Sequence, residues 1–257
     1  MKFENILPIN GPSVDEVKKY INKYNNELIV IKCGGSVLLD SNLFNIFIKD
    51  IAVLRKIGLI PIIVHGGGPK IKKKLLKSNI QSTFIKGLRV TDIKTIKIVE
   101  NVLIELNKEI VTSLKNESSA ATGITTKENN ILSVKSAEKE LGFVGVPNKI
   151  KINILNEIIK SNKIPVIAPI GLDENGQSFN INADTAAGAI AKNLKSRRLL
   201  LMTDVEGVLD KNKKLISEIN SDTAKKMIND EIITGGMIPK INTCIDAINN
   251  EVKGVVI

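Results

Sequence analysis

Short runs of β-branched and aliphatic residues alternate with amphipathic segments along the whole chain. Most of the runs lack a period-2 alternation of apolar and polar positions, which is typical of strands buried on both faces of a parallel sheet. The pattern therefore predicts βαβ units and a mainly parallel, open central sheet. The predicted strands are residues 28–32, 59–64, 165–169, 199–202 and 255–257.

Between these runs, three segments carry apolar residues on one helical face. The first has its apolar positions between Phe44 and Leu54 and is followed by Gly58, and the second carries such positions from Val99 to Ile110 and begins near Thr91 or Asp92. The third extends from about Pro239 towards Asn250. Its expected inward positions are Ile241, Ile245 and Ile248.

Residues 120–147 break this regular pattern. Glycines at 123, 142 and 145 punctuate short apolar stretches there, so we expect small strands and turns beside the main sheet. The α/β pattern then resumes. We expect two lobes that share one sheet, residues 1–172 and 173–257, with the division in the polar turn between Gly171 and Gly176.

Composition and charge narrow the class of protein. The chain has 257 residues, 43% hydrophobic and 25% charged, which excludes wholesale disorder. Its 37 basic and 27 acidic residues give a net charge of +10, but only four of the basic residues are arginine and tryptophan is absent. Nucleic-acid binding favours arginine clusters and aromatic stacking platforms. Lysines are instead spread along the chain, so we expect no nucleic-acid partner.

The two cysteines, Cys33 and Cys244, lie far apart in the sequence and lack partners for a zinc site or a disulfide framework. The first residues, 1–17, contain no apolar run of signal-peptide length, and no run in the chain reaches the length of a membrane span. We therefore predict a soluble cytoplasmic protein with no membrane partner and no protein-held metal.

Two glycine-rich loops follow predicted strands directly. The first places Lys32, Gly34 and Gly35 at the end of one strand, and the second places Gly66, Gly67 and Gly68 at the end of the next. Ligands bind at the carboxyl ends of strands in open α/β sheets, and glycine backbone N–H groups at a helix start attract anions. Two such loops at neighbouring strand ends favour an anion site over simple tight turns.

Neither loop matches a standard nucleotide fingerprint. The closest P-loop match starts at Gly171 and lacks the essential lysine, so we expect a hairpin there, and no third glycine follows the second loop to complete GxGxxG. A phosphate site in this chain must be built in another way.

Three further segments are polar where packing alone would not require it. GLRVTD presents Arg89, whose guanidinium can grip a carboxylate with two hydrogen bonds. NINADT places Asn180 and Asn182 on one side of an extended segment, followed by Asp184, which can serve as a site carboxylate, as the N-cap of an alanine-rich helix, or as both. GGMIPK places Lys240 just inside a helix start, as either a site cation or a surface lysine.

His65 is the single histidine of the chain; its place beside Gly66 leaves a catalytic role open, but at a strand end it is expected to be structural. Because it has no serine or cysteine nucleophile paired with it in the sequence pattern, hydrolytic catalysis by a triad is disfavoured. Cys33 is expected to be inert packing, although its neighbour Lys32 could lower its pKa.

Eight motifs occur in an order that resembles the amino-acid kinase family, over about Val17 to Ile257. The motif KxGGS indicates only the wider family, whereas GLRVTD, NINAD and GGMIPK resemble the branch that phosphorylates N-acetyl-L-glutamate and its aminoadipate-type relatives. The motifs are KCGGS, HGGGP, GLRVTD, LGFVG, IPVIAP, NINADT, TDVEGVLD and GGMIPK.

This resemblance implies a three-layer αβα sandwich that uses ATP, with Mg²⁺ carried by the nucleotide. The implied reaction phosphorylates the γ-carboxylate of N-acetyl-L-glutamate to N-acetyl-L-glutamyl 5-phosphate with release of ADP, the second step of arginine biosynthesis. It also implies a homodimer or larger homo-oligomer, an N-terminal lobe that binds the acyl-amino acid and dimerises, and a C-terminal lobe that binds ATP.

The resemblance also implies roles for individual residues. Lys32 and Lys240 match the lysines that stabilise the transferring phosphoryl group, and Asp184 matches the carboxylate that holds them. The implied substrate site comprises Gly67, Gly68, Arg89 and Asn180, with Arg89 on the α-carboxylate. The implied nucleotide and phosphate residues are Gly34, Gly35, Gly66, Thr203, Asp204 and Gly207.

Two departures from the family pattern leave alternatives open. Cys33 stands where the family has an aromatic residue or leucine, and relatives continue beyond GVVI with a strand-turn and a helix, about 25–40 residues on common element lengths. Residues 13–24 resemble a shortened version of the N-terminal helix that links dimers into hexamers. The alternative functions are phosphorylation of a related acyl-amino acid such as acetylaminoadipate, and non-catalytic binding of ATP or acetylglutamate.

Overall fold

The computed structural model describes residues 11–257. Its main sheet has six parallel strands in the order β12-β11-β1-β2-β8-β5. Five of them confirm the predicted strands within one or two residues, and the sixth, β5, comes from the segment expected to lie beside the sheet. The strands are β1 (Leu28–Cys33), β2 (Ile60–His65), β5 (Ala121–Ile124), β8 (Ile164–Ile167), β11 (Arg198–Leu201) and β12 (Val255–Val256).

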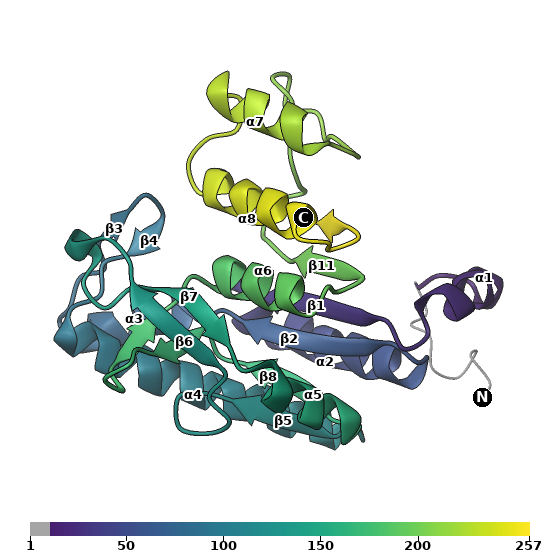
Figure 1. Cartoon of the computed structure of the whole chain (residues 1–257), viewed down its shortest axis with the longest axis horizontal. Coiled ribbons are helices and arrows are strands. Elements are labelled where there is room, and N and C mark those ends of the chain that lie inside the picture. Colours follow the sequence, from purple (N-terminus) through teal and green to yellow (C-terminus); the bar gives the residue numbers. More distant parts are fainter. Residues whose placement is uncertain (1–10) are drawn as a thin grey trace.

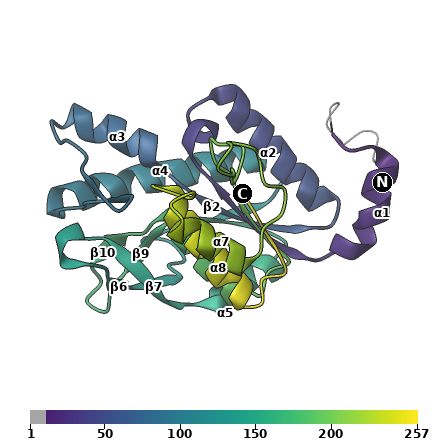
Figure 2. The ribbon, with the colours of Figure 1, turned by 90° about the horizontal axis from the view of Figure 1, so that it is seen from above.

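Helices cover both faces of this sheet, which confirms the predicted three-layer arrangement (Figures 1 and 2). On β1, Ile29 and Ile31 pack with α2 (Ser41–Lys56) and α4 (Ile93–Asn116), whereas Val30 packs on the opposite side. That opposite side carries α5 (Ile152–Lys160) and the alanine-rich α6 (Ala183–Asn193). Both faces of the strand are therefore apolar, as its sequence predicted.

A second, smaller sheet lies beside the first and has the strand order β10-β9-β6-β7. Its strands are β6 (Leu132–Ser136), β7 (Gly145–Ile150), β9 (Ile170–Leu172) and β10 (Ser178–Asn180). Strands β9 and β10 are antiparallel neighbours, which confirms the hairpin expected after Gly171. The boundary expected between residues 172 and 173 falls inside this hairpin. A separate hairpin joins β3 (Phe84–Ile85) to β4 (Leu88–Arg89).

Side-chain caps begin the two predicted helices on the α2 and α4 face. Asp92 accepts a hydrogen bond from the Thr95 N–H at 2.7 Å and starts α4. Asp40 caps α2 in the same way, and Gly58, at φ +100°, follows its end. Such caps satisfy N–H groups that have no partner inside the helix.

The third predicted helix, α8 (Met237–Asn249), packs mainly on α6 and also contacts the edge strand β12 of the main sheet. Ile241 is buried, as expected, but Ile248 is 41% exposed, so its predicted inward position is wrong. The reason is that α8 lies one layer further out, and its C-terminal half borders an open cavity of about 460 Å³ instead of a closed core.

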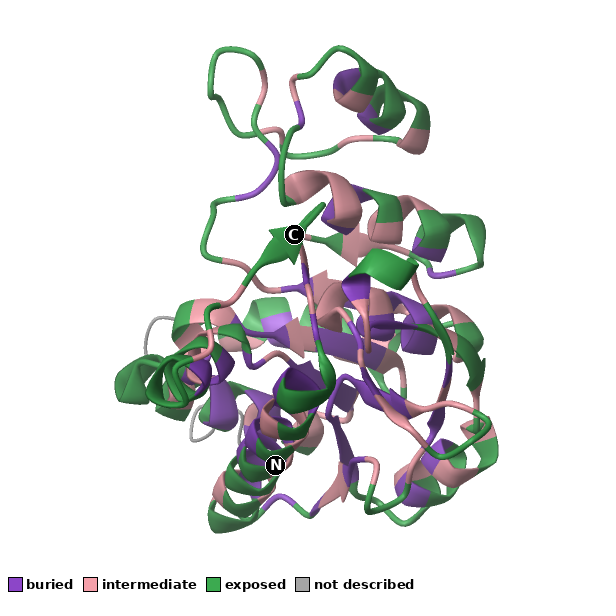
Figure 3. Cartoon of the chain, turned by 90° about the vertical axis from the view of Figure 1, so that its left-hand side faces the viewer, coloured by how far each residue is buried: buried purple, intermediate pink, exposed green. Residues whose placement is uncertain are grey.

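The remaining helices are α1 (Val14–Tyr24), α3 (Gly68–Lys77) and α7 (Ser221–Asn229). Ser13 and Glu16 form a capping box on α1, which confirms a helix in that segment. Helices α7 and α8, at the top of Figure 1, contribute to one small apolar cluster, and most residues of α7 are exposed (Figure 3). None of the helices described between residues 11 and 257 could span a membrane. The prediction that the first residues contain no signal peptide concerns, for residues 1–10, a segment outside the described residues.

Candidate active site

A cavity of about 230 Å³ opens at the carboxyl ends of β1 and β2. Nine of the thirteen site residues expected from the sequence line it, although they come from segments up to about 150 positions apart. Those nine are Lys32, Gly34, Gly35, Gly66, Gly67, Gly68, Arg89, Asn180 and Asp184. Lys240 reaches the cavity through its contact with Asp184. Their functional roles stay predictions.

Asp184 holds two lysines at once. Lys240 Nζ donates a hydrogen bond to Asp184 Oδ2 at 2.8 Å, and Lys32 Nζ lies 3.1 Å from Asp184 Oδ1. Lys32 also donates to the Met202 carbonyl at 3.3 Å. The three charged side chains are only 8–15% exposed. Two cations on one carboxylate leave net positive charge beside the cavity.

The cap of α6 is Asn182, not Asp184. Asn182 Oδ1 accepts hydrogen bonds from the N–H groups of Asp184 and Thr185 at 2.9 and 3.0 Å. Because Asn182 takes the capping role, the Asp184 carboxylate is free to hold the lysines, and the capping interpretation of Asp184 is wrong. The surface-lysine interpretation of Lys240 is also wrong, since this residue is 7% exposed.

Arg89, at the end of β4, is 8% exposed and lines the same cavity. Its guanidinium donates to the Gly68 carbonyl at 3.3 Å and to the Ser82 hydroxyl, and it lies 4.7 Å from the centre of the Phe84 ring. Burial lowers the pKa of Arg89 from its usual value, yet arginine stays charged at neutral pH. These contacts hold the Arg89 guanidinium in one orientation where the β3–β4 hairpin meets the cavity.

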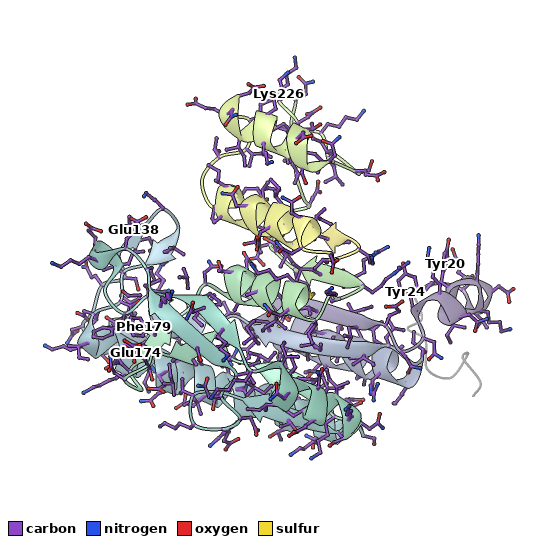
Figure 4. The ribbon with its side chains drawn as sticks, in the orientation of Figure 1. Tyr20, Tyr24, Glu138, Glu174, Phe179 and Lys226 are labelled. Carbon is purple, nitrogen blue, oxygen red and sulfur yellow. The ribbon has the colours of Figure 1, made fainter. Side chains whose placement is uncertain are left out.

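The β3–β4 hairpin is also tied to the chain beyond β6. Lys86 Nζ lies 3.1 Å from Glu138, which Figure 4 labels next to the hairpin. Both side chains are well exposed, so this ion pair contributes little to stability. Asn180, on β10, donates to Thr91 Oγ1 at 3.4 Å, and Thr91 in turn donates to the Arg89 carbonyl at 2.8 Å.

The two glycine loops lie against each other. The Gly66 N–H donates to the Cys33 carbonyl at 2.6 Å, which joins the loop after β2 to the loop after β1. Gly67 is the N-cap of α3 and provides no side-chain cap, so backbone N–H groups at this helix start remain available. A Cβ on Gly67 would approach Leu103 Cδ2 to 2.8 Å, which explains the glycine. Helices α3 and α6 both begin at this cavity, and positive helix ends attract anions.

The loop after β11 contacts the first glycine loop through Asp204, a link that the sequence analysis did not assign. Asp204 Oδ1 accepts hydrogen bonds from the Ser36 N–H at 3.1 Å and the Ser36 hydroxyl at 2.6 Å. These bonds lower the pKa of Asp204. Gly35 has φ +59°, and a Cβ there would lie 2.4 Å from Asp204 Oδ2. The serine of KCGGS was a possible signal for this contact.

The other two predicted nucleotide residues lie apart from the cavity between the glycine loops. Gly207, at φ +142°, borders the second cavity of about 460 Å³ near the end of the chain. Thr203 lines neither cavity. It does follow Met202 directly, and the Met202 carbonyl accepts from Lys32, so this loop begins beside Lys32.

His65 and Cys33 are both enclosed, with 0% exposure. Burial lowers the pKa of His65 to about 4 and raises the pKa of the Cys33 thiol to about 12, which outweighs the opposing effect of Lys32 on the thiol. At neutral pH the histidine is uncharged and the thiol protonated. Both observations agree with the expected structural roles.

With this geometry established, comparison with known proteins decides the family. The model of the amino acid kinase family matches residues 27–257. The chain belongs to the amino acid kinase family. Its sequence is 62% identical to an acetylglutamate kinase of Pelagibacter ubique over 98% of this chain and 88% of that protein.

Other members agree with this assignment. An acetylglutamate kinase of Agrobacterium fabrum is 47% identical over 93% of this chain and 86% of its own length. The crystal structure of smu.665 from Streptococcus mutans superposes with a TM-score of 0.81 at 30% identity, over 89% of this chain and 93% of that one. The chain is therefore a kinase with the fold of its family, and membership implies ATP as the phosphoryl donor.

Proposed function

We propose that this kinase transfers the γ-phosphoryl group of MgATP to the γ-carboxylate of N-acetyl-L-glutamate. The products are N-acetyl-L-glutamyl 5-phosphate and ADP, in the second step of arginine biosynthesis. The similarity to acetylglutamate kinases over nearly the whole chain supports this substrate. The observation that carries the chemistry is the placement of Lys32 and Lys240 on the Asp184 carboxylate, beside the two glycine loops.

The nucleophile in this reaction needs no general base. A glutamate-type γ-carboxyl group has a pKa of about 4.3, so it is already ionised at neutral pH. A reaction without a general base fits a site whose one histidine is enclosed and neutral. What the reaction does need is positioning and charge neutralisation as the carboxylate approaches the phosphoryl group.

Cations and N–H donors supply that neutralisation. In the proposed arrangement Lys32 and Lys240 contact oxygens of the transferring phosphoryl group, while the backbone N–H groups of Gly34 and Gly35 complete the cradle next to Gly66, whose own N–H is held by the Cys33 carbonyl. Asp184 holds both lysines and thereby reduces their mutual repulsion. Loss of one such donor typically costs about 10²–10³ in rate.

The other end of the cavity binds the acyl-amino acid. Arg89 grips the α-carboxylate, and Gly67, Gly68 and Asn180 contact the rest of the substrate. A volume of about 230 Å³ suits one small acyl-amino acid. In this proposal residues 1–172 bind that substrate with the help of Asn180, and residues 173–257, with Thr203, Asp204 and Gly207, bind ATP; association into a homo-oligomer stays a prediction.

The carboxylates near the site bear on how Mg²⁺ is held. Both oxygens of Asp184 contact lysine cations, and Asp204 already accepts two hydrogen bonds from Ser36. Because both carboxylates already have partners, they fit a divalent ion that arrives bound to ATP. Such an ion keeps the phosphate oxygens of ATP and water molecules as its ligands, as Mg²⁺ usually does in kinases. When bound, Mg²⁺ would neutralise charge on the phosphates.

The test is ADP release by the purified chain with MgATP and a panel of acceptors. N-acetyl-L-glutamate should give the highest kcat/KM, with N-acetyl-L-aspartate and N-acetyl-L-aminoadipate as neighbours in length. One methylene is worth about 1–3 kcal/mol, or about 10- to 200-fold. A higher kcat/KM for the aminoadipate derivative would transfer the assignment to that substrate. Binding of ATP and acetylglutamate in a calorimeter without ADP release would contradict the kinase proposal.

A further inference from the structure

A series of buried polar contacts connects α4 to the second glycine loop. His65 is 0% exposed and Asn107, on α4, is 2% exposed. His65 Nδ1 lies 2.9 Å from the Gly66 carbonyl, and His65 Nε2 lies 3.2 Å from Asn107 Nδ2. Asn107 Nδ2 also donates to the Val166 carbonyl, on β8, at 2.8 Å. Buried polar groups need hydrogen-bond partners. Here the Asn107 amide is the partner of both His65 Nε2 and the Val166 carbonyl.

These contacts fix where the proton of the imidazole resides. The Val166 carbonyl can only accept, so the atom of Asn107 facing it must be the amide nitrogen. The second hydrogen of that nitrogen donates to His65 Nε2, which is therefore unprotonated. The proton of the neutral ring is then on Nδ1, and Nδ1–H donates to the Gly66 carbonyl. A buried ring with a pKa near 4 keeps this state at neutral pH.

The Gly66 carbonyl belongs to the peptide that joins Gly66 to Gly67. Because a trans peptide is planar, its C=O and N–H point in opposite directions. A carbonyl held by the enclosed His65 ring therefore turns the Gly67 N–H away from that ring, and both glycines line the cavity. Within residues 11–257, no hydrogen bond from the Gly67 N–H to another residue is found.

We propose that His65 and Asn107 are positioning residues, which orient the Gly66–Gly67 peptide so that the Gly67 N–H donates to an anionic oxygen in the cavity. Asn107 acts by selecting the Nδ1–H tautomer, and His65 acts by holding the carbonyl. The identity of the anion, a substrate carboxylate or a phosphoryl oxygen, rests on the proposed kinase function.

Gly123, on β5, provides an independent handle on the same series of contacts. A Cβ at Gly123 would lie 2.4 Å from Asn107 Oδ1 and 3.6 Å from Asn107 Cγ. Gly123 does not line the cavity. Gly123→Ala should therefore displace the Asn107 amide and disturb the glycine loop without touching a ligand.

The first test is nitrogen NMR of the wild-type imidazole, which is unambiguous because the chain has one histidine. At pH 7 the spectrum should show a protonated Nδ1 and an unprotonated Nε2. The Nε2–H tautomer, or a doubly protonated ring at that pH, would overturn the proposal. This readout does not depend on catalysis, so an inactive wild-type chain would contradict the proposed function and leave the tautomer result standing.

The second test compares two replacements of His65. The amide nitrogen of asparagine lies as many bonds from Cα as Nδ1, whereas that of glutamine corresponds to Nε2. His65→Asn keeps a donor for the Gly66 carbonyl and should retain kcat within about 10-fold, while His65→Gln should lose about 10²-fold, the cost of a small misplacement in a site. If packing alone mattered, the larger glutamine would be the milder change, and that order would overturn the proposal.

Asn107→Leu and its control complete the design. Asn107→Leu removes the donor to Nε2 and should lower kcat while shifting the histidine towards a mixture of tautomers. Asn193→Leu, at the end of α6, removes an amide that donates to the Ala189 carbonyl at 2.8 Å and should leave the histidine spectrum unchanged. Thermal unfolding of each variant shows whether it is folded. A folded Asn107→Leu chain with the wild-type tautomer and kcat would refute the role of Asn107.

Discussion

Lys240 and Asp184 are joined at 2.8 Å across the contact between α8 and α6. The approach of the two helices is set one turn further along by Gly188 on α6 and Thr243 on α8, because a Cβ on Gly188 would meet Thr243 Cγ2 at 2.5 Å. A glycine in a helix interior costs about 1 kcal/mol relative to alanine. Here it allows the close packing that brings the carboxylate to the lysine.

Asp184→Asn should abolish most activity and destabilise the chain. Lys32 and Lys240 would be left buried without a counter-charge, and breaking a buried ion pair costs about 3–5 kcal/mol. We expect kcat to fall by about 10²–10³. Asp246→Asn is the matched control, since its pair with Lys192 has the same 2.8 Å distance but is 33–52% exposed and is worth about 0–1 kcal/mol. Urea unfolding and steady-state kinetics measure both, and equal losses in the two variants would refute the special role of Asp184.

Gly188→Ala should lower kcat although this residue contacts no substrate. The added methyl group pushes α8 away from α6, with an overpacking cost of about 1–3 kcal/mol, and moves Lys240 away from Asp184. Thr243→Ser removes the methyl group in the way and keeps the hydroxyl that donates to the Pro239 carbonyl. The double variant should recover stability and kcat; failure of this rescue would mean that the helix contact does not set the lysine position.

Arg89→Lys should raise the KM for N-acetyl-L-glutamate by about 10- to 150-fold, the value of 1.5–3 kcal/mol for hydrogen bonds to a charged group. Lysine keeps the charge but loses the two-pronged grip and the stacking on Phe84. The KM for ATP should change much less. Arg55→Lys, whose guanidinium donates to the Leu59 carbonyl at 3.2 Å outside the cavity, is the control. If Arg89→Lys changed the KM for N-acetyl-L-glutamate and the KM for ATP equally, this would argue against substrate binding by Arg89.

Ser36→Ala should raise the pKa of Asp204 towards its usual value of 3.8, because the Ser36 hydrogen bonds lower it in the folded chain. A depressed folded-state pKa stabilises the protein above the unfolded pKa, and this stability is lost as the pH falls through the lower folded value. The wild type should therefore resist acid more than Ser36→Ala. Carboxyl carbon NMR between about pH 2 and pH 6 follows the Asp204 titration directly; identical curves would show that the contact is absent in solution.

The sequence predicted the parallel sheet well because its strands are apolar on both faces. Residues Ile29, Val30 and Ile31 show this, since neighbours on one strand pack into different clusters. It was wrong about Ile248, which belongs to an amphipathic helix that covers mainly another helix, α6. Helical periodicity gives the apolar face but not how far the neighbouring element extends.

Nine site residues were brought to one cavity because strand ends and helix starts meet at one edge of a parallel sheet. The sequence did not predict that Asn182 caps α6 while Asp184 holds the lysines, since asparagine and aspartate are both good N-caps. The Asp204–Ser36 and His65–Asn107 contacts join positions 168 and 42 residues apart. Such long-range side-chain contacts depend on the packing of whole elements, which no local pattern contains.

The most direct measurement is the product formed from MgATP and N-acetyl-L-glutamate in the presence of hydroxylamine, which converts acyl phosphates to hydroxamates. The proposed carboxylate phosphorylation predicts one hydroxamate for each ADP released, and loss of both in Lys240→Ala. ADP released without hydroxamate, or unaffected by Lys240→Ala, would contradict phosphorylation of the γ-carboxylate by this site.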